Sequence, residues 1–243
     1  MELEDQRVLV TGATAGIGQE TAKLFARRGA SVVITGRDTG RGAQTVAAIE
    51  AEGGRADFIA ADLNDLESVR GLAERAGEVD VLVNNAANDA RHTVEAVTPE
   101  YWDQSMAVNL KHQFFASQAV IPAMKKAGRG SIINMSSISW MIPSVGLPVY
   151  ITAKAAIVGL TRTLAHELGA SNIRVNCVLP GAIFTERQKQ LWFTEAYKAE
   201  ILSRQALKRL ISPDEVARLV LFLAADDSGA ITNQSYVIDG GWV

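Results

Sequence analysis

Hydrophobic residues in this 243-residue chain follow two alternating patterns. Runs that we expect to be strands occur at 8–10, 31–35, 57–60, 79–83, 131–135, 175–179 and 236–238. The run at 8–10 is continuously apolar, which is typical of a strand buried on both faces of a sheet. Between these runs lie segments that we expect to be helical, at 16–28, 39–52, 65–76, 98–124, 150–168 and 213–223. Strands that alternate with helices indicate a parallel sheet covered on both faces. The pattern therefore predicts an α/β fold.

Residues that begin and end helices support this division. Thr98 and Pro99 are suited to the N-cap and first turn of the fourth helix, which we expect to bend at Pro122. Residues 212–215, Ser-Pro-Asp-Glu, form a capping box with proline at the first helical position. Gly169 follows the fifth helix as a stop signal. No linker or repeat interrupts the pattern, so we expect a single domain over residues 1–243.

Composition and charge restrict the function classes. Hydrophobic residues make up 48% and charged residues 21% of the chain, as is ordinary for a globular protein. A net charge of −3 gives no reason to expect a nucleic-acid partner. No apolar run reaches the roughly eighteen residues of a membrane span. Cys177 is the one cysteine and has no internal disulfide partner, so we expect a cytoplasmic protein.

Three motifs fall at the carboxyl ends of expected strands, where ligands bind in such sheets. Residues 11–18, Thr-Gly-Ala-Thr-Ala-Gly-Ile-Gly, lie between the first strand and the first helix. Glycines let the backbone approach a pyrophosphate, and a helix N-terminus favours its charge. The spacing differs from the common Gly-x-Gly-x-x-Gly, so this segment alone is also compatible with a plain glycine turn. The other two motifs are Asn-Asn-Ala-Ala at 84–87 and Pro-Gly at 180–181.

Tyr150 and Lys154 form the candidate catalytic pair. Their four-residue spacing places both side chains on one face of a helix. An ammonium group near a phenol favours the phenolate, so we expect Lys154 to lower the pKa of Tyr150 from about 10. Ser137 follows the strand at 131–135, and its hydroxyl is placed to hold a substrate oxygen beside the tyrosine. Such a pair alone is also common on protein surfaces, and the other motifs give it weight.

In this order and spacing, the motifs resemble those of the short-chain dehydrogenase/reductase family over essentially the whole chain. The resemblance implies a doubly wound, Rossmann-like sheet of about seven parallel strands and an NAD(P)-dependent oxidoreductase. Ala87 departs from the family, which usually has glycine there. Asn109 stands at the position of the family's catalytic asparagine, which supports a water relay. The implied catalytic residues are Asn109, Ser137, Tyr150 and Lys154.

The resemblance also assigns the cofactor site, whereas the spacing of the histidines gives the reason to expect no metal. His92, His112 and His166 have no ligand-like spacing. The helices at 101–126 and 150–168 resemble those through which family members pair, so we expect a homotetramer, and residues 185–205 correspond to the family's substrate lid. The implied cofactor contacts are Gly12, Thr14, Ala15, Gly16, Ile17, Gly18, Arg37, Asp62, Leu63, Asn85, Ala86, Tyr150, Lys154, Pro180, Gly181, Ile183 and Thr185.

Cofactor preference depends on the end of the second strand. Members that prefer NAD usually have a carboxylate where Gly36 falls, and here Arg37 follows instead, which can bind a 2′-phosphate. Ala15 is not the basic residue that many NADP-preferring members have, and Asp38 can serve the ribose. We expect NADP to be preferred, with NAD also possible. The alternative is that Arg37 is a solvated surface charge.

Polar residues around the expected site suit a polyhydroxylated substrate. Segments at 88–92, 101–103, 109–112, 137–140 and 186–188 resemble those of aldose 1-dehydrogenases in this family. We expect oxidation of a sugar at C1 to a lactone, with Tyr150 as base and Ser137 on the anomeric oxygen. The alternatives are a carbonyl or 3-oxoacyl thioester reductase and a non-catalytic dinucleotide-binding sensor. The residues expected at the ring hydroxyls are Asn88, Asp89, Trp140 and Gln188.

Overall fold

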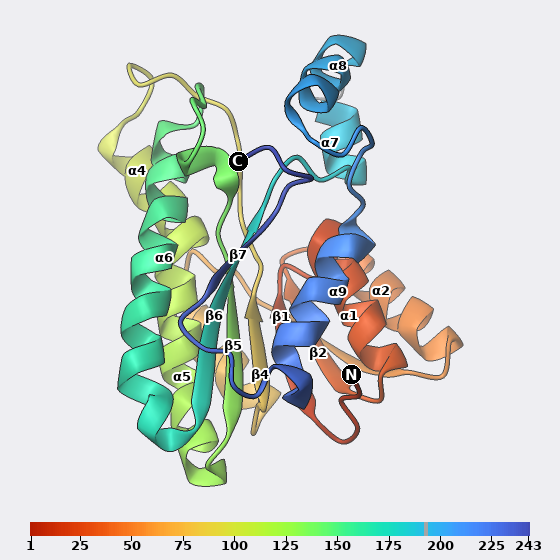
Figure 1. The fold of residues 1–243 in the computed structure, drawn as a ribbon. Helices are drawn as coiled ribbons and strands as arrows, with labels where there is room; N and C mark the ends of the chain where they lie inside the picture. Colours follow the sequence, from red (N-terminus) through yellow and green to blue (C-terminus); the bar gives the residue numbers. More distant parts are fainter. Residues whose placement is uncertain (192–193) are drawn as a thin grey trace.

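A seven-stranded parallel sheet forms the centre of the computed structural model, which describes residues 1–191 and 194–243 (Figure 1). The strand order is β3-β2-β1-β4-β5-β6-β7, and every neighbouring pair is parallel. The prediction of a parallel α/β sheet of about seven strands is confirmed. The strands are β1 (Arg7–Thr11), β2 (Ser31–Gly36), β3 (Arg55–Ala60), β4 (Val81–Asn84), β5 (Gly130–Met135), β6 (Ile173–Pro180) and β7 (Ser235–Ile238).

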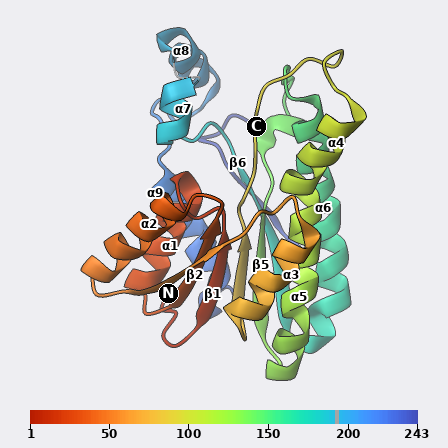
Figure 2. The ribbon, with the colours of Figure 1, turned by 180° about the vertical axis from the view of Figure 1, so that it is seen from behind.

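Helices cover both faces of the sheet, as Figures 1 and 2 show from opposite sides. One face carries α1 (Gly16–Arg27), α2 (Thr39–Ala51) and α9 (Pro213–Ala224). The other carries α3 (Leu66–Ala76), α5 (His112–Ala127) and α6 (Pro148–Leu168). Buried aliphatic side chains form a large core on each side of the sheet, which explains the apolar runs in the inner strands β1, β2 and β4.

The helix expected at 98–124 is three segments in the structure. α4 (Pro99–Met106) continues into a π-helical turn, η1 (Ala107–Lys111), and then into α5. Pro122 lies inside α5, which runs on to residue 127, so the interruption comes earlier than the bend expected at the proline. The π-helical turn contains Asn109, whose side chain hydrogen-bonds to the backbone of Asn88, 21 residues away. This contact between distant segments has no local sequence signal.

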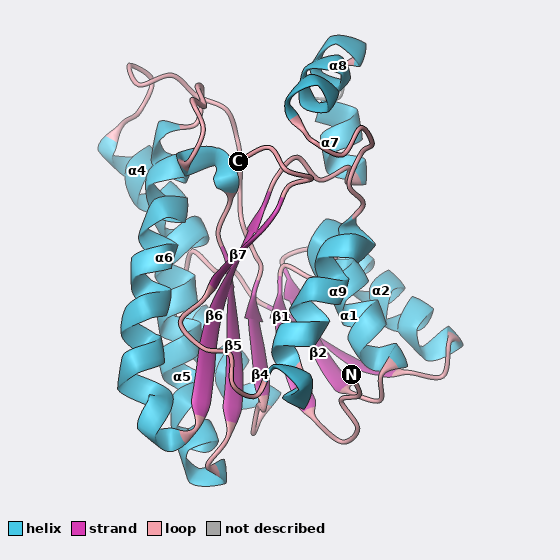
Figure 3. Ribbon diagram, in the orientation of Figure 1, coloured by secondary structure: helices cyan, strands magenta, loops and turns pink. Residues whose placement is uncertain are grey.

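The strand order reverses at β1, which lies between β2 and β4. Such a reversal opens a crevice at the carboxyl ends of the strands, where ligands bind in open α/β sheets. Beyond these ends lie α7 (Glu186–Leu191) and α8 (Glu195–Arg204), at the top of Figure 3. They fall within the expected lid at 185–205, of which residues 192 and 193 lie outside the described residues.

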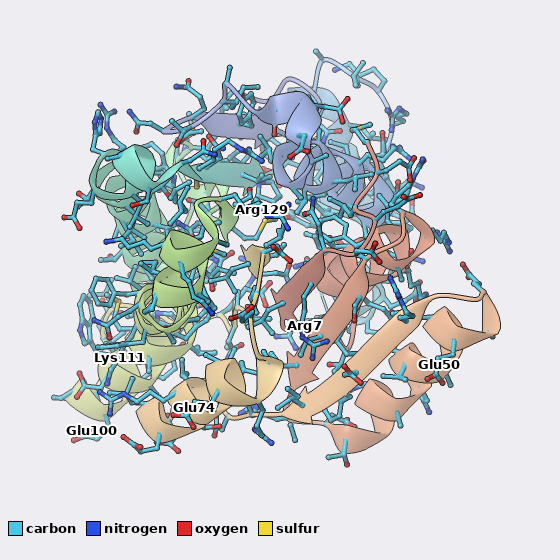
Figure 4. All side chains as sticks on the ribbon, turned by 90° about the horizontal axis from the view of Figure 1, so that it is seen from below. Arg7, Glu50, Glu74, Glu100, Lys111 and Arg129 are labelled. Atoms are coloured by element: carbon cyan, nitrogen blue, oxygen red, sulfur yellow. The ribbon has the colours of Figure 1, made fainter. Side chains whose placement is uncertain are left out.

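The opposite end of the sheet is held together by ion pairs and hydrogen bonds. The carboxylate of Asp80 accepts from the backbone N–H of Arg7 at 2.9 Å and from the guanidinium of Arg129 at 3.1 Å. Figure 4 labels both arginines at this end, seen from below. These charged groups therefore stabilise the fold and lie away from the crevice.

Candidate active site

The turn between β1 and α1 packs directly against the turn after β4. Gly12 has a φ of +65°, and a Cβ there would lie 2.7 Å from the Cα of Ala86. The side-chain amide of Asn85 donates to the carbonyl oxygens of Thr11 at 2.9 Å and of Gly12 at 3.1 Å. A Cβ on Gly18 would collide with that same amide. The glycines therefore allow the two turns to approach each other closely.

The N-terminus of α1 is suited to hold a phosphate group. Ala15 is the N-cap residue and has no polar side chain to bind the first N–H groups of the helix. Gly16 has a φ of +59° and lies near the methyl group of Thr185. Backbone N–H groups and the helix dipole together favour an anion here. This geometry fits the pyrophosphate of a dinucleotide.

A cavity of about 720 Å³ extends from this turn to Tyr150. It is lined by nearly all the catalytic, cofactor and substrate residues expected from sequence. The exceptions are Gly18, Asn109 and Trp140, which are not among its lining residues. The expected residues that do line it are Gly12, Thr14, Ala15, Gly16, Ile17, Arg37, Asp62, Leu63, Asn85, Ala86, Asn88, Asp89, Ser137, Tyr150, Lys154, Pro180, Gly181, Ile183, Thr185 and Gln188.

Tyr150, Lys154 and Ser137 meet in this cavity. Tyr150 is in the first turn of α6, and Lys154 follows one turn later with its ammonium nitrogen 5.5 Å from the centre of the tyrosine ring. Lys154 is buried and donates to the carbonyl oxygen of Met135 at 2.8 Å. Ser137 lines the same cavity, and its side chain acts to lower the pKa of Tyr150. A proton acceptor, a hydroxyl donor and a buried cation thus share one wall of the cavity.

The expected lowering of the Tyr150 pKa is not found in the protein alone. Burial raises the pKa of Tyr150, the carboxylate of Asp89 raises it further, and the side chain of Ser137 opposes them. The pKa of Lys154 is itself lowered to about 8, mainly by burial. Desolvation therefore outweighs the ammonium group in this environment. Sequence spacing showed that the two groups are close but not how deeply they are buried.

The side chain of Asn109 binds the backbone of Asn88, a residue of the cavity wall. Its carbonyl oxygen Oδ1 accepts from the backbone N–H of Asn88 at 2.8 Å, and its amide donates to the Asn88 carbonyl at 3.1 Å. The same amide donates to the carbonyl of Ser105 at 2.9 Å. Asn109 is fully buried, so its side chain fixes Asn88 in position instead of facing the cavity.

Asp89 links the cavity wall to α7. One oxygen of its carboxylate accepts from Arg187 at 3.1 Å, and the other accepts from the side-chain amide of Gln188 at 2.9 Å. Thr185 caps α7 by accepting from the backbone N–H of Gln188 at 3.2 Å. These contacts bring the expected substrate residues Asp89 and Gln188 together. Trp140 is exposed and stands apart from them, outside the lining.

The first turn of α2, just after β2, contains a second arginine that the sequence analysis did not assign. Arg41 lines the cavity together with Arg37. Asp38 is the N-cap of α2 and accepts from the backbone N–H of Arg41 at 2.9 Å and from its guanidinium at 2.8 Å. These contacts lower the pKa of Asp38, the backbone hydrogen bond having the largest effect. Asp38 is therefore already engaged as a cap and ion-pair partner.

Other lining residues were also missed, among them Tyr101 and Arg187. Tyr101 is in the first turn of α4, and only the path of the 85–98 segment brings it to the cavity. Arg187 was part of a matched segment, but its ion pair with Asp89 spans 98 residues.

No described group of three or more His, Cys, Asp or Glu side chains is arranged to hold a metal ion. Within the described residues, helices long and apolar enough to span a membrane are absent.

The dinucleotide-type fold and this set of residues define an oxidoreductase of the Rossmann-like class. A family model described as enoyl-(acyl carrier protein) reductase matches residues 12–243. A solved structure of a short chain dehydrogenase/reductase family protein is 40% identical, with a TM-score of 0.90, over 99% of this chain and 98% of that one. The chain belongs to the short-chain dehydrogenase/reductase family, as the sequence motifs predicted.

Curated relatives with high identity are named as sugar dehydrogenases. The chain is 48% identical to the "Probable galactose dehydrogenase" of Rhizobium meliloti and 45% identical to the D-xylose 1-dehydrogenase of Caulobacter vibrioides. Both alignments cover 99% of this chain and 96% of the relative. The structure of a 3-oxoacyl (acyl-carrier-protein) reductase from Agrobacterium tumefaciens, with NADP bound, is 29% identical. Its TM-score is 0.93, over 99% of this chain and 95% of that one.

Proposed function

We propose that the protein oxidises an aldose at its anomeric carbon to the corresponding lactone, with NAD(P) as hydride acceptor. The observation that carries the proposal is that one cavity joins the glycine-rich turn to Ser137 and Tyr150 and adds hydrogen-bonding side chains beside them. Such side chains suit a ligand with several hydroxyl groups and would be left unpaired by an acyl chain. The names of the two curated relatives support the same substrate class.

The chain's residues then have distinct roles in this proposal. Ser137 donates to the anomeric oxygen, and Tyr150 takes the proton of the C1 hydroxyl. A dinucleotide held in this cavity would supply the hydride acceptor for C1, and the balanced products are the lactone, reduced cofactor and one proton. Lys154 holds the nicotinamide ribose and stabilises negative charge on the tyrosine oxygen. Asn109 fixes Asn88 and supports the exit of the proton through water.

Ring hydroxyls of the sugar meet Asn88, Asp89 and Gln188 in this proposal. Asp89 and Gln188 already bind each other at 2.9 Å, so a sugar hydroxyl can bridge the same two groups as donor and acceptor. Trp140 remains as a stacking candidate only if its side chain moves, because it lies outside the lining. We propose that the region 185–205 is the lid, since α7 is fastened to the wall through Asp89.

The deciding experiment measures cofactor reduction with D-xylose, L-arabinose, D-galactose and D-glucose, each beside its 1-deoxy analogue. We expect turnover with at least one free aldose and at least a 100-fold lower kcat/KM for its 1-deoxy form, because the group that is oxidised is missing. A 3-oxoacyl thioester with reduced cofactor serves as the comparison substrate. Good activity on the thioester and none on any aldose would reject the sugar assignment in favour of a carbonyl reductase.

Cofactor preference is the second part of the proposal. We propose NADP, with NAD as a weaker alternative, because Arg37 and Arg41 line the cavity and Asp38 is occupied by Arg41. A Cβ on Gly36 would lie 2.7 Å from the Cγ2 of Thr14, so a carboxylate at this position would require Thr14 to move. The charge at the end of β2 therefore suits a 2′-phosphate better than a 2′-hydroxyl.

Replacing both Arg37 and Arg41 by alanine should lower kcat/KM for NADP by about 10- to 100-fold, since each charge-assisted hydrogen bond contributes roughly 1.5–3 kcal/mol and some solvent screening remains. The value for NAD should stay within about twofold, because NAD has no phosphate there. Arg218→Ala, in the exposed ion pair with Asp214 on α9, is the control for a lost surface charge. An unchanged NADP-to-NAD ratio in the double variant would contradict the assignment.

Assembly and location complete the proposal. We propose a homotetramer that pairs through α5 and α6, whose outer surfaces form an apolar groove of about 360 Å³ lined by Leu110, Lys111, Phe114, Phe115, Ala156 and Leu160. Phe114 is exposed in the single chain, and pairing would bury it.

We also propose a cytoplasmic location, supported by the one buried, unpaired cysteine, Cys177.

A further inference from the structure

Helix α6 has no cap from its own N-cap residue. That residue, Leu147, has an aliphatic side chain, and Pro148 at the first helical position has no N–H. The first N–H of the helix is therefore that of Val149, whose nitrogen lies 3.4 Å from Nε2 of His92. His92 comes from the segment between β4 and α4, 57 residues earlier in the chain. A side chain from a distant segment thus occupies the capping position of the helix that carries Tyr150.

The contacts of His92 determine which of its nitrogens carries hydrogen. Nε2 must be unprotonated to accept from Val149, so the hydrogen of the neutral ring is on Nδ1. Nδ1 lies 3.0 Å from the carbonyl oxygen of Ala90 and 2.8 Å from the hydroxyl oxygen of Tyr101, and both can accept it. These contacts therefore select the tautomer with hydrogen on Nδ1.

His92 is held firmly in this position. Its backbone N–H donates to the carbonyl of Gly146 at 2.9 Å, in the turn that leads into α6. Its ring packs against the ring of Tyr101 with 4.6 Å between centroids. Tyr101 lines the same cavity as Tyr150. A chain of contacts therefore runs from the cavity wall through Tyr101 and His92 to the amide that precedes Tyr150.

We propose that His92 is a positioning residue that caps α6 from another segment and thereby holds the hydroxyl of Tyr150 in its reactive place, with Tyr101 as its support. The inference rests on the proposed oxidation, in which Tyr150 takes the proton. Reaction rates are sensitive to such placement, since a displacement of about 1 Å can lower a rate about 100-fold. Of the residues expected to contact the dinucleotide, only Tyr150 and Lys154 lie on α6, and the others that line the cavity come from other elements. Loss of the cap should therefore affect the placement of the tyrosine hydroxyl far more than the binding of the dinucleotide.

The test compares His92→Leu, which removes the acceptor, with His92→Gln, whose side-chain oxygen can accept from the Val149 N–H in its place. We expect His92→Leu to lower kcat for the aldose at least 10-fold, to leave KM for the dinucleotide within about twofold and to speed hydrogen exchange at the amide of Val149. His92→Gln should recover most of both the rate and the protection. His166→Leu, an exposed histidine on the same helix, is the matched control and should change neither.

The outcomes separate this inference from the proposed function. An inactive Tyr150→Phe beside a His92→Leu variant with normal kcat would overturn the positioning role alone. An active Tyr150→Phe would remove the tyrosine as the base, on which this inference rests, and unchanged exchange at Val149 in His92→Leu would remove the cap. The absence of turnover with every aldose in the wild-type enzyme would instead remove the proposed function. Equal losses in His92→Leu and His92→Gln would show that the acceptor is not what matters. If His92→Leu does not fold, Tyr101→Phe decides: normal kcat together with normal exchange at Val149 would overturn the proposal.

Discussion

Tyr150→Phe is expected to lower kcat for aldose oxidation by roughly 10²–10⁴-fold, the range for losing a positioned acid or base. The substitution removes one oxygen atom and keeps the ring beside the ammonium group of Lys154. The fold and the binding of the dinucleotide should therefore be retained. Steady-state kinetics with the best aldose measures the first effect, and a fluorescence titration with reduced cofactor measures the second.

Tyr236→Phe is the matched control for this substitution. Tyr236 is on β7, packs against the core and is not among the residues that line the cavity. Loss of its hydroxyl should leave kcat within about twofold of the wild-type value. A Tyr150→Phe enzyme that turns over at nearly the normal rate would exclude the tyrosine as the base. The proton would then have to leave through a different group in the cavity.

The centre of the sheet was predictable because its inner strands are buried on both faces. A strand such as β4 has no solvent-facing side, so its residues form a continuous apolar run that does not depend on distant contacts. The strand ends were less certain: β6 runs from Ile173 to Pro180, beyond the expected 175–179. Pairing with β5 and β7 extends this strand, and the apolar residues of the sequence do not predict that pairing.

The candidate site was predictable where its residues are close in sequence or follow strand ends. The carboxyl ends of parallel strands meet at one edge, so Gly12, Asn85 and Gly181 had to come together once the sheet was recognised. The rest depends on contacts between distant segments. The ion pair of Asp89 with Arg187 spans 98 residues, and the bond of Val149 to His92 spans 57. Neither leaves a local pattern in the sequence.

Electrostatic effects were the least predictable. The spacing of Tyr150 and Lys154 correctly indicated that the two side chains are close. The direction of the Tyr150 pKa shift depends mainly on burial, and the spacing of residues along the chain does not reveal burial. In the same way, sequence placed Asp38 near the cofactor but did not reveal that Arg41 already engages it. Both differences arise because a charged group responds to everything packed around it.

Gly12→Ala is expected to have a large effect on both stability and cofactor binding. An alanine at a φ of +65° is strained by about 1–2 kcal/mol. Its Cβ would also lie 2.7 Å from the Cα of Ala86, a backbone atom that cannot rotate away, and such overpacking costs roughly 1–3 kcal/mol more. Urea denaturation should show a total loss of about 2–5 kcal/mol, the sum of these two costs.

Gly53→Ala separates the two causes. Gly53 has a φ of +80°, but no described atom lies within 4 Å of the position that its Cβ would take. This variant should therefore show the backbone strain alone, about 1–2 kcal/mol, with unchanged affinity for the dinucleotide. Gly12→Ala should in addition weaken cofactor binding more than 10-fold, because it forces apart the turns after β1 and β4 that line the cavity. If the two variants were equally stable and bound the cofactor equally well, the close approach at Gly12 would not be needed for the site.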